Sequence, residues 1–228
     1  QGFPYHRSGC INNTMRDAPE TTIPYAIGTS LDVAYQNMGI GGQTTTEIAA
    51  RFVRDVVALA PRMAVIEGGI NDINGGGAQE TYIANWTTML DACEIAGIIP
   101  ICLAIFPCSN LSNSLQRKRE SWNAALRDLV AQYSSAVYVD VTPYVGQYRP
   151  SGDAGNLWDI IPEYAGDGTH YTPAGRTLIG QAIADAIESE YGTLQSRAAG
   201  VEGEGATVDA TRSFAAASRH AEVEAPGS

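Results

Sequence analysis

The chain has 228 residues, of which 44% are hydrophobic and 17% charged, a size and composition suited to one sizeable α/β domain rather than two. The chain has a formal net charge of −11 and a pI near 4.6. This negative charge repels phosphate backbones, which argues against a nucleic-acid partner. The longest dense apolar run covers residues 98–106. A membrane-spanning helix needs roughly 20 apolar residues, so this shorter run predicts a buried strand and no membrane span.

Strand-like and helix-like segments alternate from residue 33 onward. Residues 33–37 are predicted to form a short strand that ends in a glycine-rich turn. Thr44-Thr45-Thr46-Glu47 has the capping-box pattern, so a helix should begin there. A second strand is predicted at residues 63–66 and a second helix at about residues 79–96.

The second half of the chain continues the same alternation. We predict strands at residues 98–105 and 136–141, with a helix at residues 115–133 between them. The last helix covers residues 173–191, with Thr172 as its N-cap and Pro173 at its first position. Alternating helices and continuously apolar strands imply a parallel sheet that is covered on both faces.

The composition changes after this last helix. Residues 195–228 are rich in alanine, glycine, glutamate and serine and contain few large apolar side chains. We therefore predict one α/β domain at residues 1–192 and a flexible low-complexity tail at residues 193–228.

Cysteine and histidine usage gives no sign of a metal site. The chain has four cysteines and three histidines, none of the cysteines forms a C-x-x-C pair, and no zinc-ligand spacing is present. No cofactor is predicted. Cys93 and Cys102 lie in apolar stretches and are expected to be buried thiols, whereas a disulfide involving Cys10 or Cys108 stays open, and with it the redox compartment.

Three loops at predicted strand ends carry residues suited to acyl-transfer chemistry. In an open parallel sheet, ligands bind at the carboxyl ends of the strands. Residues 37–42 contain glycines that can expose backbone N–H groups, and Asn71 in residues 67–72 can donate to a developing oxyanion. Asp167 lies three residues before His170 and can orient its imidazole for general-base work. Taken singly, each loop could be an ordinary turn or a structural histidine; together they favour one catalytic site.

These motifs resemble the blocks of the SGNH, or GDSL, hydrolase family. Gly42 falls where the second block has its oxyanion-hole glycine, and Gly69-Ile70-Asn71-Asp72 is similar to the third block, which makes Asn71 the second oxyanion donor. Asp167-Gly168-Thr169-His170 is similar to the last block, with His170 as the base and Asp167 as its partner. The resemblance implies a flavodoxin-like three-layer α/β/α fold with a parallel sheet.

The first block of that family, a hydrophobic strand ending in Gly-Asp-Ser, is absent from the chain. Residues 1–5 look like its continuation, so the nucleophile serine is expected just upstream of Gln1. Ser30 lies too close to Asn37 for a crossover, and Ser8 follows no apolar strand. The missing strand belongs at the centre of the sheet, so we expect the chain as written to be incomplete or unable to fold alone in the family manner.

The resemblance implies a serine ester hydrolase of the carboxylesterase or acetylesterase type, acting on small-molecule esters that include acylated carbohydrates. Tyr5, Trp158 and Tyr171 are candidates to line a sugar site, although Trp158 and Tyr171 fit local packing equally well. A lipid substrate is also compatible. Two other classes remain: an inactive SGNH-like binding domain without the nucleophile, and a flavodoxin-like protein that binds a cofactor at residues 39–42, which would leave Asp167 and His170 unexplained.

Overall fold

The computed structural model describes residues 21–149 and 157–192, and its centre is a parallel β-sheet. Strands β1 (Met63–Ile66), β2 (Ile99–Leu103) and β3 (Val137–Val139) lie in the order β1-β2-β3. Met63 pairs with Ile99, and Ile101 pairs with Val137. The predicted strand at residues 63–66 is therefore confirmed, and so is the parallel arrangement.

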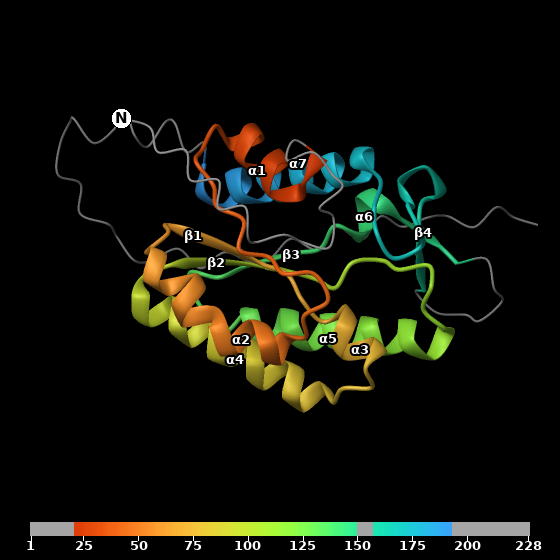
Figure 1. Cartoon of the computed structure of the whole chain (residues 1–228), viewed down its shortest axis with the longest axis horizontal. Helices are drawn as coiled ribbons and strands as arrows, with labels where there is room; N and C mark the ends of the chain where they lie inside the picture. The colour runs from red at the N-terminus through yellow and green to blue at the C-terminus, as the bar shows by residue number, and fades with distance from the viewer. Residues whose placement is uncertain (1–20, 150–156, 193–228) are drawn as a thin grey trace, which may run out of the picture. The chain divides into compact units, whose positions relative to one another are not determined.

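Helices cover both faces of this sheet (Figure 1). One face carries α2 (Thr45–Asp55), α4 (Gln79–Ala96) and α5 (Asn113–Val130). The other face carries α1 (Ile23–Leu31), the short α6 (Thr142–Val145) and α7 (Pro173–Tyr191). The three-layer α/β/α architecture implied by the sequence is confirmed.

Each helical layer packs its own apolar core against the sheet. Strand alternation sends Cys102 into the core beneath α4 and α5, which includes Trp86 and Trp122, and sends Ile101 and Leu103 into the core beneath α7. All of these side chains are buried. Burial on both faces explains why β2 reads in the sequence as a continuous apolar run.

The predicted helix starts coincide with side-chain caps. Thr44 Oγ1 accepts a hydrogen bond from the Glu47 N–H, and the Glu47 carboxylate accepts from the Thr44 N–H, which completes the capping box of α2. Thr172 Oγ1 caps α7 by accepting a hydrogen bond from the Gly175 N–H, and Pro173 is at the first helical position. The bounds of α4 agree with the predicted residues 79–96, whereas α5 begins two residues before the predicted residue 115 and ends at Val130 rather than residue 133.

Strands β2 and β3 are shorter than the strands predicted at residues 98–105 and 136–141. Ala104 still donates to the Val139 carbonyl, but both backbone polar groups of Ile105 bond to the side-chain amide of Asn123 on α5, at 2.8 and 3.0 Å. A side chain thus replaces the neighbouring strand as the hydrogen-bond partner of Ile105, and the ladder ends at Leu103. The predicted helix residue Asn123 therefore has a specific structural role.

The strand predicted at residues 33–37 is wrong. These residues have no regular secondary structure, and the side chains of Val33 and Tyr35 are 37% and 45% exposed. An extended segment becomes a strand only when a neighbouring strand accepts and donates its backbone hydrogen bonds, and within the described residues β1 pairs with β2 alone. The segment instead follows helix α1, which the sequence prediction missed although Thr22 caps it and Pro24 lies in its first turn.

Short elements complete the described part of the chain. Strands β4 (Gly146–Tyr148) and β5 (Trp158–Ile160) form an antiparallel pair, and α3 (Ile70–Asn74) follows β1. Two 3₁₀ helices, η2 (Val57–Leu59) and η3 (Pro162–Tyr164), precede β1 and α7 respectively.

Several predictions from the sequence concern residues outside those that the structure describes. These are the tail at residues 193–228, Ser8, Cys10, and residues 1–5 with Tyr5.

Cys93, Cys102 and Cys108 are buried free thiols, and burial raises the pKa of Cys93 to about 11. None of the helices in residues 21–149 and 157–192 has the length and apolar character that crossing a membrane requires.

Candidate active site

Asp167 and His170 form the hydrogen-bonded pair that their spacing predicts. His170 Nδ1 lies 2.8 Å from Asp167 Oδ2, and both side chains are about 60% exposed. The other carboxylate oxygen of Asp167 accepts hydrogen bonds from the backbone N–H groups of Thr169, at 3.0 Å, and His170, at 2.8 Å. The carboxylate therefore fixes both the imidazole ring and the backbone that carries it.

The same contacts control the charge of Asp167. The imidazole and the two backbone N–H donors hold the pKa of the Asp167 carboxyl well below its usual range. An ionised carboxylate at Nδ1 favours the tautomer in which Nδ1 carries the proton, which leaves His170 Nε2 to accept a proton. This arrangement suits a general base.

The loop after β2 holds the Asp167–His170 turn in place. Ser109 N–H donates to the Gly168 carbonyl at 2.8 Å, and the side-chain amide of Asn110 donates to the Asp167 carbonyl at 2.8 Å. Gly168 has a φ of +86°, and a Cβ added there would overlap the Asn110 side chain. Glycine is therefore required between Asp167 and His170 both for its conformation and for the close approach of Asn110.

The chain is also anchored immediately after His170. Tyr171 is 7% exposed, its hydroxyl donates to the Pro107 carbonyl at 2.8 Å, and its ring packs edge-on against Phe106. Of the aromatic residues considered for a sugar site, Tyr171 is therefore a packing residue. Trp158 stacks on Tyr148, with ring centroids 4.2 Å apart, and is half-buried.

The two predicted oxyanion donors, Gly42 and Asn71, lie on neighbouring loops that are joined by a hydrogen bond. The Asn71 side-chain amide donates to the carbonyl of Gln43, the residue after Gly42, at 2.9 Å. A primary amide has a further N–H beyond the one used in this bond. Gly42 is exposed with a φ of +83°, and among the described residues other than its chain neighbours no atom lies within 4 Å of where a Cβ would stand.

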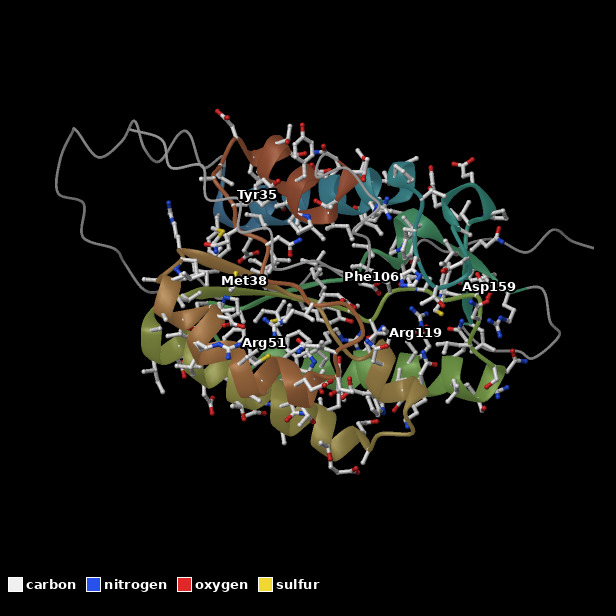
Figure 2. All side chains as sticks on the ribbon, viewed as in Figure 1. Tyr35, Met38, Arg51, Phe106, Arg119 and Asp159 are labelled. Atoms are coloured by element: carbon white, nitrogen blue, oxygen red, sulfur yellow. The ribbon has the colours of Figure 1, made fainter. Side chains whose placement is uncertain are left out.

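Arg51 fixes the loop that leads to Gly42. Its guanidinium donates to the Met38 carbonyl at 2.8 Å and to the Gln43 side-chain carbonyl at 2.7 Å, and it forms an ion pair with Asp55 at 3.1 Å. Both Arg51 and Met38 are labelled in Figure 2. The approach to Gly42 is thus held by α2 rather than by a strand.

Asp72 is a structural residue of the site that the sequence prediction left without a role. Its carboxylate is 7% exposed and accepts from the N–H of Thr45, at 2.9 Å, and from the Thr45 hydroxyl, at 2.6 Å. Asn85 on α4 donates to the same hydroxyl at 3.0 Å. Asp72 thereby binds the first turn of α2 to the Asn71 loop. This contact joins residues 27 positions apart, so no local sequence signal indicates it.

A shallow depression of about 190 Å³ lies beside Asn71. It is lined by small and polar residues, which are Thr44, Thr46, Asn71, Asp72, Gly75, Gly77, Ala78 and Thr81. Within the described residues, no three histidine, cysteine or acidic side chains come close enough together to hold a metal ion.

Asn71 and the loop that supports the Asp167–His170 turn both follow the carboxyl ends of neighbouring strands. Asn71 comes after β1, and residues 108–110, which hold the Asp167–His170 turn, come after β2. A Cβ at Gly69 would lie 2.6 Å from the Ile105 side chain, so these two loops are in direct contact. Convergence of all four predicted residues on a single carbonyl group stays a prediction. Ser30 lies instead in α1, where its hydroxyl bonds to Gln181 of α7.

Comparison with known proteins identifies the family. The model of the GDSL-like lipase/acylhydrolase family matches residues 9–178, whereas a search of curated proteins gave no match. A solved lipolytic protein of the G-D-S-L family from Desulfitobacterium hafniense has 21% identity and a TM-score of 0.61, with 75% of this chain and 91% of that chain covered.

Two Bacteroides proteins are similar in the same way. A GDSL-like lipase from Bacteroides thetaiotaomicron has 24% identity and a TM-score of 0.60, with 72% and 79% covered. An acylhydrolase from Bacteroides fragilis has 27% identity and a TM-score of 0.58, with 72% of this chain and 78% of that chain covered. The chain belongs to the GDSL-like lipase/acylhydrolase family.

Proposed function

We propose that the protein is a serine ester hydrolase that uses a Ser-His-Asp mechanism with a Gly/Asn oxyanion hole. The observation that carries the proposal is the Asp167–His170 pair, which is joined at 2.8 Å and held by the loop after β2. Membership of a family of lipases and acylhydrolases supports the same reaction class.

In the proposed mechanism, His170 Nε2 takes the proton of the serine hydroxyl while the serine oxygen attacks the ester carbonyl carbon. The Gly42 N–H, the Asn71 side-chain amide and the N–H of the serine stabilise the negative charge on the carbonyl oxygen. His170 then gives this proton to the leaving alcohol. In the second step the same nitrogen takes a proton from a water molecule, whose oxygen attacks the acyl-serine carbonyl; the bond to the serine oxygen breaks, the acid is released, and His170 gives the proton to the serine oxygen.

The nucleophile is proposed to be the serine of the first family block, expected N-terminal to Gln1. Within the described residues, Ser30 is excluded from the site by its place in α1. The experiment therefore uses the protein with its natural upstream sequence, and a Gly-Asp-Ser motif at the end of an apolar segment is the expected finding.

The proposed substrates are short acyl esters, including acetyl groups on carbohydrates. The depression beside Asn71 has a volume of only about 190 Å³, which favours a short acyl group over a long acyl chain. Among solved structures of the same fold, one is an acetyl esterase, 22% identical with a TM-score of 0.52. Another is a carbohydrate esterase of family 3 from Talaromyces cellulolyticus, 20% identical with a TM-score of 0.51.

The test is hydrolysis of p-nitrophenyl acetate, butyrate and octanoate and of acetylated xylose by the protein with its upstream sequence. We expect turnover that is fastest on acetate, lost on substitution of the upstream serine by alanine, and stoichiometric labelling of that serine by a fluorophosphonate. A protein that carries the serine but neither turns over any of these esters nor reacts with the fluorophosphonate would contradict the proposal. That result would instead favour an inactive binding domain.

A further inference from the structure

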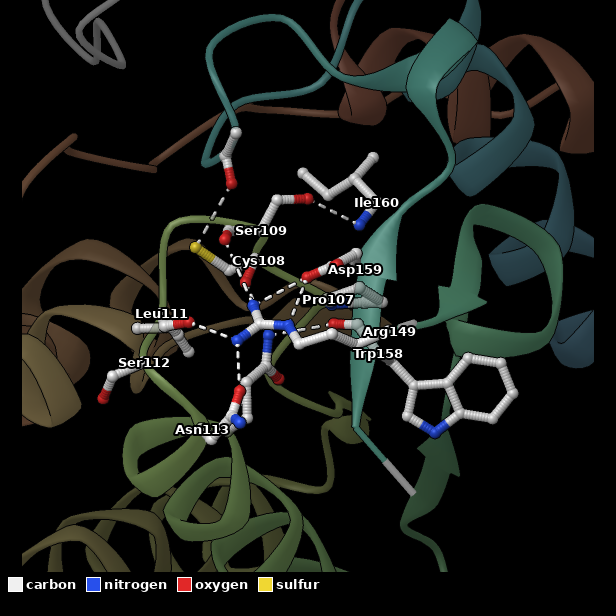
Figure 3. A network of polar contacts seen from close by, with 12 residues as sticks. Pro107, Cys108, Ser109, Leu111, Ser112, Asn113, Arg149, Trp158, Asp159 and Ile160 are labelled. Carbon is white, nitrogen blue, oxygen red and sulfur yellow. Dashed lines mark hydrogen bonds and ion pairs between the residues drawn. The ribbon is translucent and has the colours of Figure 1, made fainter. Parts of the chain in front are cut away.

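A second layer of polar contacts lies behind the loop that holds Asp167 and His170, and Arg149 is at its centre (Figure 3). Arg149 directly follows β4, and its side chain is 13% exposed. Its Nε and one terminal nitrogen bond to Asp159 on β5, at 2.9 and 2.6 Å. The ion pair therefore joins the two strands of the β4–β5 hairpin.

The remaining N–H groups of Arg149 reach away from the hairpin to the loop after β2. They donate to the Ser109 carbonyl at 3.1 Å, the Leu111 carbonyl at 2.7 Å and the Asn113 side chain at 2.9 Å. Every N–H of the guanidinium has an acceptor, and only the planar, forked geometry of arginine can serve these acceptors at once.

Ser109 connects this network to the catalytic turn. Its carbonyl accepts from Arg149, its hydroxyl accepts from the Ile160 N–H at 2.9 Å, and its own N–H donates to the Gly168 carbonyl at 2.8 Å. Arg149 is thus connected to Gly168 through the backbone carbonyl and N–H of one residue, Ser109, and Asp167 directly precedes Gly168.

A buried side chain on α5 supports the same loop from behind. Gln116 is fully buried, and its amide donates to the Cys108 carbonyl at 2.6 Å and to the Trp158 carbonyl at 2.9 Å. The β4–β5 pair and the loop after β2 are therefore joined through Arg149, through Gln116 and through the direct bond from the Ile160 N–H to the Ser109 hydroxyl.

We propose that Arg149 is a positioning residue for the Asp167–His170 pair. Bound to Asp159, it fixes the backbone of residues 109–111, and that backbone holds the turn that presents the imidazole. Arg149 itself does not touch the pair through any of its contacts described above. For the activity readout, this inference rests on the proposed hydrolase function.

The first test is amide hydrogen exchange measured by NMR in the full chain, which does not depend on catalysis. Arg149→Met removes the fork but keeps a long side chain, so the amides of Ser109, Thr169 and His170 should exchange at least about tenfold faster. Amides in α4 should keep their rates. The control Arg127→Met removes an exposed pair with Asp128, whose atoms are 3.8 Å apart, and should change none of these amides.

Two further variants keep the test decisive. Asp159→Asn removes the charge of the partner and should accelerate the same amides to a smaller extent, which covers the case in which Arg149→Met does not fold. Arg149→Lys keeps the charge but has fewer donors, so it should fall between Arg149→Met and the wild type. Wild-type protection in Arg149→Lys would overturn the role of the fork. Unchanged rates in Arg149→Met, or equal acceleration in α4, would overturn the proposal.

The second test measures ester hydrolysis by the protein with its upstream sequence. A misplaced imidazole slows the chemical step more than it weakens substrate binding, so Arg149→Met should lower kcat by about 10- to 100-fold and change KM by less than about threefold. An active wild type with an unaltered kcat in Arg149→Met would overturn the positioning role. An inactive wild type would contradict the hydrolase function alone, because hydrogen exchange still decides the role of Arg149.

Discussion

Removing the carboxylate of Asp72 should destabilise the fold at the point where the Asn71 loop meets the first turn of α2. In Asp72→Ala, the completely buried Thr45 loses the acceptor of its N–H, while its hydroxyl keeps the bond from Asn85. An unsatisfied buried donor costs about 1–3 kcal/mol, and a hydrogen bond to a charged group contributes about 1.5–3 kcal/mol. Because these two costs overlap, we expect the free energy of unfolding to fall by about 2–4 kcal/mol.

The isosteric variant Asp72→Asn separates the shape of the side chain from its charge. Its amide oxygen can still accept from the Thr45 N–H, and its amide nitrogen can donate to the Thr45 hydroxyl, so we expect a loss of only about 1 kcal/mol. Asp128→Ala is the control, because the Asp128 side chain is 77% exposed and should contribute less than about 0.5 kcal/mol.

The assay is urea unfolding followed by the fluorescence of the buried residues Trp86 and Trp122, with the change in midpoint read at constant m-value. The predicted order of stability is wild type, Asp72→Asn, Asp72→Ala. An Asp72→Ala protein within about 0.5 kcal/mol of the wild type would show that Asp72 does not hold the start of α2.

Three further predictions concern the site. Gly168→Ala should destabilise the protein by more than about 2 kcal/mol and Gly42→Ala by about 1 kcal/mol. Both glycines have a positive φ, but only a methyl group at residue 168 would overlap the Asn110 side chain. Equal losses of stability in urea unfolding would contradict this. Asn71→Ala should lower kcat by about 10²–10³-fold with little change in KM, and full activity would exclude it from the oxyanion hole. Because the pKa of Asp167 is lowered in the folded protein, its ionised carboxylate stabilises the fold above pH about 4, the ordinary pKa range of an aspartate, and this contribution is lost as the pH falls. The difference in the free energy of unfolding between the wild type and Asp167→Asn should therefore be larger at pH 7 than at pH 3.

The fold was predictable where local signals and burial agreed. The capping box at Thr44 and the Thr172-Pro173 pair fixed two helix starts, and the apolar run before Phe106 indicated a strand buried on both faces. The strand predicted at residues 33–37 failed because its formation depends on a neighbouring strand, a partner that local pattern does not reveal.

The candidate site was predictable to a similar degree. Asp167 and His170 are close in the sequence, so their contact followed from spacing within one turn. The roles of Asp72 and Arg149 depend on contacts with residues 27 and 10 or more positions away, which no local motif encodes. Long-range hydrogen bonds of this kind become visible only when the topology has brought the loops together.

The most direct test of the proposed function is a crystal structure of the protein, with its upstream sequence, after reaction with diethyl p-nitrophenyl phosphate. We predict phosphorus bound to the upstream serine, with one phosphoryl oxygen about 2.7–3.1 Å from both the Gly42 nitrogen and the Asn71 amide nitrogen, and His170 Nε2 facing the serine oxygen. A phosphorylated serine from which His170 and Asn71 are both turned away would contradict the proposal that these residues form one catalytic site.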